Sequence, residues 1–339
     1  MRLLVVTQKV DATDRNLGFF VGWIEKFAEQ GEIVVIANEV NADTVRQLPS
    51  TISVFSLGKE NGASRLARFL RYQVLLFRHL PAVDGVFFHM CPEYVLCAHW
   101  LPKLYGKKSI LWYVHKQVSV RLRLAVCFIN KLFTASKESC RLRSKKVEIV
   151  GHGIDVDLFN GKREGNGGVC LLTVGRISPT KDLRTLILGF LRVREAIPDA
   201  TFSIVGDPIT DTDCVYHTEL LREFSDKVQF KGGVPYGSLP AVYATATVFV
   251  HASRTGSMDK AVLEALASGL PVFTSSEAFD GEIPGIVTFK EDNPEDLSEK
   301  IDRAFERGGI GYNEKGSEWI LKNHNLTNLV KRLVSFCTV

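Results

Sequence analysis

The sequence lacks both the cysteine pairs of disulfide-rich or zinc-binding proteins and the long apolar runs of membrane-spanning ones. Its seven cysteines are an odd number, they are scattered, and none forms a C-x-x-C pair, which predicts reduced thiols. No apolar run approaches the roughly 18 residues that a spanning helix needs. The first residues, MRLLVVTQ, show no apolar core of a signal peptide. We therefore expect a cytoplasmic protein.

The composition shows no bias toward disorder. Hydrophobic residues make up 45% of the 339 residues and charged residues 24%, which is ordinary for a globular protein, and the length predicts about two domains. The charge is unevenly divided: residues 1–150 hold 22 Lys+Arg against 12 Asp+Glu, or +10, so the remainder carries −6 of the net +4. Two domains with different partners would explain this division, and so would chance variation of solvated surfaces.

Short apolar segments alternate with helical patterns along most of the chain. Because these segments lack strict alternation, they indicate strands that are buried on both faces. Strands are predicted at residues 2–7, 33–37, 52–55, 85–88 and 109–114, and again at 170–174, 202–206, 228–230, 248–252 and 271–275. Helices between strands indicate parallel βαβ units. The segment 151–168, rich in Gly, Asn and Asp, predicts a linker.

These patterns predict an α/β protein of two Rossmann-like parallel-sheet domains that face each other across a cleft. The expected division is an N-terminal domain at 1–150, the linker at 151–168, a second domain at 169–316 and C-terminal helices at 317–339. Since open parallel sheets bind ligands beyond the carboxyl ends of their strands, functional residues are expected just after strands.

The segment TVGRISPTKDLRTLILGF (173–190) contains a strand end, a loop and the start of a helix. It places Arg176 and Lys181 near a helix N-terminus, where a guanidinium and an ammonium suit a diphosphate and would stabilise a negatively charged leaving group. Both residues would equally be solvated loop charges if no ligand binds there.

A second segment, HASRTGSMDKAVLEALASGLPVFTS (251–275), repeats this order of strand, turn and helix. Thr255, Gly256, Ser257 and Met258 precede the helix, whose backbone N–H groups would face a ligand. Glu264 lies among apolar neighbours inside the helix, so its carboxylate needs partners. A ribose diol would supply two hydroxyl donors, and an ion pair with a basic residue is the alternative.

Together with GHGIDVDLF (151–159), FSIVGDP (202–208) and VQFKGGVPYGSLPAVYATATVFVHAS (228–253), these segments resemble the family 4 retaining glycosyltransferases, which have the GT-B fold. The resemblance covers about residues 150–310. It implies that Arg176 and Lys181 hold the diphosphate of a nucleotide-sugar donor and that Glu264 binds its ribose. It also implies that the backbone around Gly233 and Val234 contacts the base, with uridine and guanosine both open.

The sequence departs from the family at one position. The first of the family's paired glutamates, which usually contacts the donor sugar, corresponds to Gly256, and the stretch that contains it reads Gly256, Ser257, Met258 and Asp259 here. The donor sugar is therefore left open, and Asp259 or Lys260 could take the place of the missing carboxylate. The resemblance implies that no metal or further cofactor is needed. Asp211-Thr212-Asp213 matches the letters of a D-x-D motif, but it lies in a predicted loop after the strand at 202–206 and is interpreted as a turn.

The N-terminal half matches the family more loosely. Gly18 precedes a helix where the family's first loop lies under the donor phosphates, and His115 directly follows a strand where the family often has a functional histidine. A structural histidine is the alternative for His115, and turn formation is the alternative to acceptor binding for Asp11 and Asp14. The resemblance further implies that the last helix packs back on the N-terminal domain.

The basic N-terminal half suggests where the acceptor lies. The helix predicted at 64–79 is amphipathic and carries four arginines, and residues 116–146 add nine basic side chains. Such a surface suits an anionic membrane, and a solvated basic surface over an ordinary core is the alternative.

We therefore predict a retaining, metal-independent glycosyltransferase that uses a UDP- or GDP-linked sugar. The catalytic candidates are His115, Arg176 and Lys181, and the donor-binding candidates are Gly18, Arg176, Lys181, Gly233, Val234, Gly256, Ser257, Met258 and Glu264. The expected acceptor is a saccharide or a lipid-linked saccharide of cell-envelope polysaccharide or glycolipid synthesis, at the inner face of the cytoplasmic membrane. The alternatives are a GT-B nucleotide-sugar epimerase or hydrolase and a nucleotide-binding partner subunit with weak activity. No motif supports nucleic-acid binding.

Overall fold

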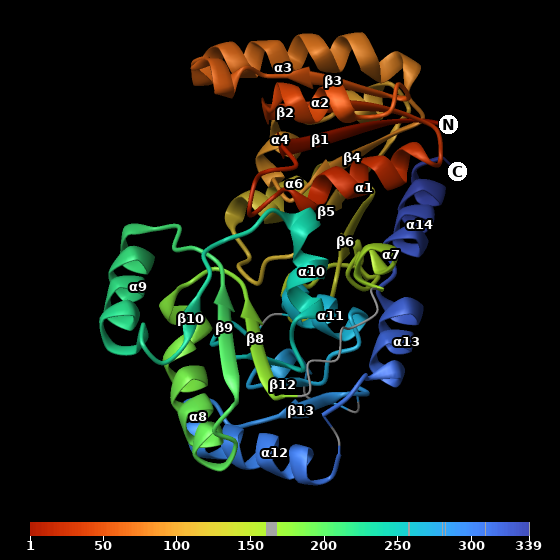
Figure 1. Cartoon of the computed structure of the whole chain (residues 1–339). Helices are drawn as coiled ribbons and strands as arrows, with labels where there is room; N and C mark the ends of the chain where they lie inside the picture. The colour runs from red at the N-terminus through yellow and green to blue at the C-terminus, as the bar shows by residue number, and fades with distance from the viewer. Residues whose placement is uncertain (161–167, 257, 280, 282, 309, 339) are drawn as a thin grey trace. The chain divides into compact units, whose positions relative to one another are not determined.

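The computed structural model describes residues 1–160, 168–256, 258–279, 281, 283–308 and 310–338. The chain divides into two compact units: unit 1 comprises Met1–Asp155 and His324–Val339, and unit 2 comprises Val156–Asn323. Each unit is built on one parallel sheet (Figure 1), which confirms the predicted α/β fold of two Rossmann-like domains. The predicted linker spans the boundary after Asp155, and its residues 161–167 lie outside the described residues.

Unit 1 contains a seven-stranded sheet in the order β3-β2-β1-β4-β5-β6-β7. Its strands are β1 (Arg2–Val10), β2 (Glu32–Val40), β3 (Ile52–Ser56), β4 (Gly85–His89), β5 (Lys108–Trp112), β6 (Lys131–Thr134) and β7 (Val147–Ile149). The sequence patterns predicted the first five. They missed β6 and β7, which are four and three residues long and in which the few apolar residues are mixed with Lys131 and Glu148.

Helices cover both faces of this sheet. They are α1 (Phe19–Ala28), α2 (Ala42–Gln47), α3 (Arg65–His79), α4 (Pro92–Ala98), α5 (Leu101–Leu104), α6 (Val120–Phe128) and α14 (Leu326–Thr338). Alternate residues of β1 point to opposite faces: Leu4 and Val6 pack with α3, α4 and α6, whereas Leu3 and Val5 pack with α1 and α14. The last helix of the chain is therefore part of the core of unit 1.

Unit 2 contains a six-stranded parallel sheet in the order β10-β9-β8-β11-β12-β13. Its strands are β8 (Cys170–Val174), β9 (Thr201–Val205), β10 (Gln229–Phe230), β11 (Val248–His251), β12 (Val272–Thr274) and β13 (Ile286–Thr288). Its helices are α7 (Val156–Phe159), α8 (Leu183–Ala196), α9 (Asp211–Phe224), α10 (Leu239–Ala244), α11 (Lys260–Ala267), α12 (Pro294–Glu306) and α13 (Glu314–Asn323). One core contains buried side chains of β8, β9, α8, α9 and α12, and α11 packs against α13. No helix of the described residues is long and apolar enough to cross a membrane.

The packing of α14 yields a stability prediction. Leu333 is 1% exposed in the core that α14 shares with α1, so Leu333→Ala should lower the free energy of unfolding of unit 1 by about 2–5 kcal/mol. Leu321→Ala is the matched control, because Leu321 lies on α13 with 52% of its surface exposed, and its effect should stay within about 0.5 kcal/mol. Denaturant unfolding monitored by tryptophan fluorescence measures both. Equal effects would show that α14 is not part of this core.

Candidate functional site

Two loops at the carboxyl end of the unit 2 sheet lie backbone against backbone. They follow β8 and β9, and the N–H of Gly175 donates to the carbonyl of Val205 at 2.9 Å. Gly206 has a φ of +149°, and a Cβ at this position would lie 1.8 Å from the carbonyl oxygen of Gly175. Glycine is therefore required at position 206, and the two loops meet at the edge where open parallel sheets bind ligands.

Arg176 and Lys181 line one small pocket at this edge, together with His251 at the end of β11. The pocket has a volume of about 10 Å³, which is room for about one water molecule. The side chain of Arg176 is 43% exposed, and its Nε lies 3.6 Å from Oδ2 of Asp213. Asp213 itself caps α9 through a reciprocal pair of hydrogen bonds with Thr210. The fold thus brings together the two cations that the sequence singled out.

Lys181 is the first member of a chain of polar contacts. Its Nζ donates to Oδ2 of Asp259 at 2.6 Å, and Nε2 of His251 lies 2.6 Å from the same oxygen. Nδ1 of His251 in turn lies 2.9 Å from the hydroxyl of Thr274, at the end of β12. Three neighbouring elements, β11, β12 and the loop after β8, therefore converge on one carboxylate.

The charges of Asp259 and His251 determine where the protons of these polar contacts lie. Burial raises the pKa of Asp259, but Lys181 and His251 outweigh burial and hold that pKa well below its usual range. Burial lowers the pKa of His251, so the ring is neutral at pH 7. Because an ionised carboxylate only accepts, Nε2–H of His251 donates to Asp259, and the Thr274 hydroxyl donates to Nδ1. The ammonium of Lys181 has three N–H donors, so this contact to Asp259 leaves two for an anion.

Glu264 is 3% exposed inside α11 and has protein partners. Burial raises its pKa, the hydroxyl of Tyr243 donates to its Oε2 at 3.1 Å, and Nζ of Lys260 lies 3.4 Å from its Oε1. Lys260 also donates to the hydroxyl of Tyr236 at 3.0 Å. The structure therefore contains the ion pair that was the alternative to ribose binding, and the ribose role of Glu264 stays a prediction.

The turn before α11 has an unusual glycine. Gly256 has a φ of +59°, and a Cβ there would lie 2.3 Å from Oε1 of Glu277, in the short helix Glu277–Phe279 that follows β12. Where the family has a glutamate, this chain thus has bare backbone with a carboxylate from another segment packed against it. Met258 is half-buried in the same turn, and Ser257 lies outside the described residues.

Gly233 and Val234 belong to the loop after β10. The N–H of Gly233 donates to Oδ1 of Asp207 at 3.0 Å, and the N–H of Gly206 donates to the carbonyl of Gly232 at 3.0 Å. This loop is therefore attached to the one that follows β9, at the same edge of the sheet as Arg176.

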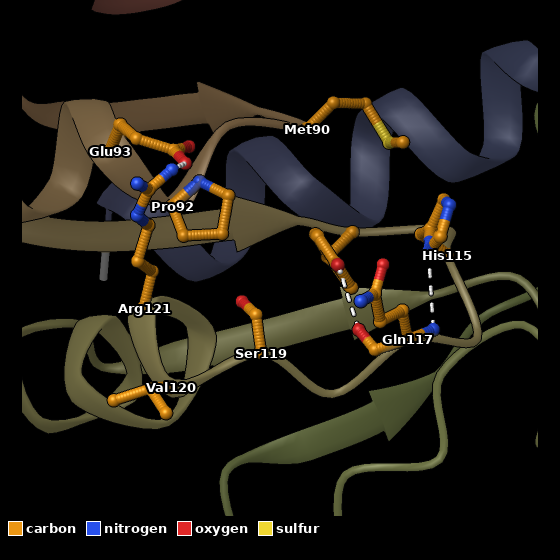
Figure 2. Close-up of a pocket in the computed structure, with 9 residues that line it drawn as sticks. Met90, Pro92, Glu93, His115, Gln117, Ser119, Val120 and Arg121 are labelled. Carbon is orange, nitrogen blue, oxygen red and sulfur yellow. Dashed lines mark hydrogen bonds and ion pairs between the residues drawn. The ribbon is translucent and has the colours of Figure 1, made fainter.

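In unit 1, His115 lies in the loop after β5 and lines a cavity of about 530 Å³. Nδ1 of His115 accepts from the N–H of Gln117 at 3.1 Å, and Arg121 of α6 pairs with Glu93 of α4 at 2.9 Å on the other side of the cavity (Figure 2). The cavity is lined by Met90, Pro92, Glu93, Tyr113, His115, Gln117, Ser119, Val120 and Arg121. Its mixed polar and apolar lining suits a saccharide.

Three further residues of unit 1, Gly18, Asp14 and His89, make structural contacts. Gly18 precedes α1, and a Cβ there would lie 2.4 Å from the carbonyl oxygen of Asp14, so the turn itself requires glycine. Asp14 accepts from the N–H groups of Asn16 and Leu17 and from Lys9. The ring of His89 is 2% exposed and stacks on that of Phe20 at 3.6 Å.

Three residues of this candidate site were not predicted from the sequence. His251 carried a signal, because it is a polar residue at the end of an apolar strand, VFVH. Tyr243 and Glu277 carried none, since a tyrosine in a helix and a glutamate after a strand are common at surfaces. Only the fold brings Tyr243 to Glu264 and Glu277 to Gly256.

Solved structures share this architecture along the whole chain. Alr3699/HepE of Anabaena, in complex with UDP, matches with a TM-score of 0.74 at 14% identity over 99% of both chains. The lipopolysaccharide outer core galactosyltransferase WaaB matches with a TM-score of 0.67 at 14% identity over 100% of both chains. The two parallel-sheet units thus have the GT-B fold.

The second half of the chain matches one family model. Residues 168–307 match the model of glycosyl transferases group 1. YtcC of Bacillus subtilis is 30% identical over 146 residues, which are 40% of this chain and 36% of YtcC. Sulfoquinovosyl transferase SQD2 of Arabidopsis thaliana is 26% identical over 261 residues, 74% of this chain and 45% of SQD2. The chain therefore spans less than half the length of these two relatives.

The charge of Asp259 yields a pH-dependent prediction. Asp259→Asn should lower the free energy of unfolding of unit 2 by about 1–3 kcal/mol at neutral pH, because it removes the partner of Lys181; the 21% exposure of the Asp259 side chain keeps the cost low. The folded-state pKa of Asp259 lies below the unfolded value of about 3.9. The contribution of the Asp259 carboxylate to the free energy of unfolding is therefore complete above the unfolded-state pKa and declines as the pH falls toward the folded-state pKa.

Denaturant unfolding of both proteins across a pH series checks this prediction. The difference between them should be constant above about pH 5 and shrink below about pH 3.9. Asp226→Asn, at an exposed position, is the control and should change stability by less than about 0.5 kcal/mol. A difference that grows on acidification would contradict the assigned charge.

Proposed function

We propose that this chain is a retaining glycosyltransferase that moves a sugar from a nucleotide-sugar donor to a saccharide or lipid-linked acceptor. One observation carries the proposal: Arg176 and Lys181 line the same pocket at the carboxyl end of a parallel sheet, inside the segment that matches glycosyl transferases group 1. The likeness to a structure that holds UDP-glucose, with a TM-score of 0.73, supports UDP as the first nucleotide to test.

In the proposed reaction, the bond between the anomeric carbon and the diphosphate breaks, and the acceptor hydroxyl forms the new bond on the same face. The proton of that hydroxyl passes to the departing phosphate, so the reaction needs no metal and no further cofactor. Arg176 and Lys181 stabilise the charge that develops on the diphosphate. Asp259 acts as a positioning residue, because its contact at 2.6 Å holds the ammonium of Lys181 at the pocket.

The remaining donor contacts follow the resemblance. Gly18, Gly233, Val234, Gly256, Ser257 and Met258 offer backbone to the donor, and Glu264 turns from Lys260 and Tyr243 toward the ribose. The acceptor binds in the cavity beside His115, an exposed residue that serves the reacting centre. The proposed setting is the cytoplasm, at the inner face of the cytoplasmic membrane, in cell-envelope polysaccharide or glycolipid synthesis.

A nucleotide-binding partner subunit with weak activity is the second candidate. It is favoured by Gly256, which has no side chain where the family has a carboxylate. A GT-B nucleotide-sugar epimerase or hydrolase would use the same donor site without an acceptor.

A thermal-shift screen with UDP, GDP, ADP and CMP tests the donor site. A nucleotide present at about 100 times its dissociation constant should stabilise the chain by about 2.7 kcal/mol, and we expect one nucleoside diphosphate to exceed the others. The matching nucleotide sugars follow, with and without acceptor saccharides. A shift without transfer or hydrolysis would favour the partner subunit, and no shift with any nucleotide would refute the donor site.

Substitutions test the roles of the two cations. Arg176→Ala and Lys181→Ala should each lower kcat about 10²–10³-fold, because each removes a charge that stabilises the leaving diphosphate. Arg222→Ala is the matched control, since Arg222 is exposed on α9. Steady-state kinetics with the identified donor measures all three, and wild-type rates in either site variant would disprove the diphosphate assignment.

A further inference from the structure

The outer surface of one helical layer of unit 1 is unusually apolar. On α3, the side chains of Leu66, Leu70, Val74 and Phe77 are 66%, 55%, 64% and 52% exposed. Their spacing of four, four and three residues places them in one stripe along the helix. The opposite side of α3 is buried on the sheet through Tyr72, Leu75 and Leu76, so the exposed stripe is not needed for the core.

The neighbouring helices extend this surface. Gln73 of α3 donates a hydrogen bond to the carbonyl of Cys97 in α4 at 3.0 Å. The ring of His99, directly after α4, lies 5.7 Å from the ring of Phe128 in α6. We define the α3–α6 face by its exposed apolar side chains: Leu66, Phe69, Leu70, Val74, Phe77, Trp100, Leu104, Val120, Leu124 and Phe128. These are ten of the sixteen large hydrophobic side chains that are exposed in the described part of the chain.

Positive charge is interleaved with this apolar surface. Residues 64–128 contain ten Lys and Arg against two Asp and Glu, and α3 has no acidic residue. Arg68 is held by Asn38 at 2.7 Å. In contrast, Arg65, Arg71 and Arg78 are exposed, and none of the three has an ion-pair partner among the residues that the structure describes.

From this surface we infer that the α3–α6 face docks on a membrane that contains anionic lipid. Apolar side chains enter the boundary between headgroups and acyl chains, while arginines beside them contact anionic headgroups. A second copy of the chain would bring the same excess of positive charge against itself. Nucleic acid would match the charge but leave ten large apolar side chains in water.

The inferred docking is a surface contact and not a membrane span. α3 has 15 residues, so it is about 22 Å long and lies along the interface. Several weak contacts, each sensitive to salt, make such docking reversible. The inference deepens the proposed function, because it supplies a lipid surface where a lipid-linked acceptor is found, but docking itself requires no sugar transfer.

Vesicle flotation of the whole chain tests the inference. Vesicles of phosphatidylcholine with phosphatidylglycerol should bind the protein and release it as salt increases, and phosphatidylcholine alone should bind it weakly. The double variant R65Q/R78Q should weaken partition about 25-fold, because each basic residue near an anionic surface adds about fivefold. The double variant L70S/F77S should weaken it on both kinds of vesicle.

Matched controls come from α9 of unit 2. Arg222→Gln and Val215→Ser change an exposed arginine and an exposed valine outside the α3–α6 face, and both should float like the wild type. Trp100, 56% exposed, provides a second readout: its emission should shift to shorter wavelength on anionic vesicles, and Trp100→Phe should remove most of that shift while flotation persists.

Three results would overturn the inference: no flotation on anionic vesicles at low salt, equal binding of the wild type and both α3 double variants, or self-association in gel filtration that these variants abolish. The last result would assign the face to a second copy of the chain. The thermal shift with nucleotides is measured on the same preparations. A nucleotide shift without flotation would therefore refute docking alone, and flotation without a nucleotide shift would refute the donor site alone.

Discussion

A parallel sheet must be covered on both faces, and this constraint organises the whole chain. Each strand of unit 1 pairs in parallel, so every connection crosses a face, and side chains at alternate positions of β1 are buried on opposite sides. One face is covered by α1 together with the last helix, α14, which lies beyond all of unit 2 in the sequence. The same parallel order brings the carboxyl ends of the strands to one edge of each sheet, where the candidate site residues lie.

In unit 2, electrostatics decides how that edge is arranged. A carboxylate beside a buried histidine is costly unless a cation compensates it, and Lys181 does so for Asp259 at 2.6 Å. The lysine is thereby ordered before any ligand arrives, which reduces the entropy that phosphate binding would otherwise cost. Arg176 is less constrained, since its contact with Asp213 is longer and more exposed. The pocket thus combines one fixed cation with one adaptable cation.

The sequence predicted the fold more completely than the site. Apolar segments identified most strands of both sheets, including the short β10 and β12. The strands β6, β7 and β13 were missed, because their few apolar residues are mixed with or flanked by charged residues or glycine. Arg176 and Lys181 could be predicted because each lies near the end of a strand or the start of a helix. The contact of Glu264 with Tyr243 and the contact between Gly256 and Glu277 could not, because each joins residues about 20 positions apart through packing that no local pattern records.

The contact between Gly256 and Glu277 also makes these positions interdependent. The Cβ of a glutamate introduced at position 256 would lie 2.3 Å from Oε1 of Glu277. The left-handed backbone at this position would add strain of about 1 kcal/mol. The clashing atoms are the far end of the Glu277 side chain, so this side chain would have to rotate away from the new residue. The two positions are therefore coupled: the effect of a side chain at position 256 on the stability of unit 2 depends on which residue stands at position 277.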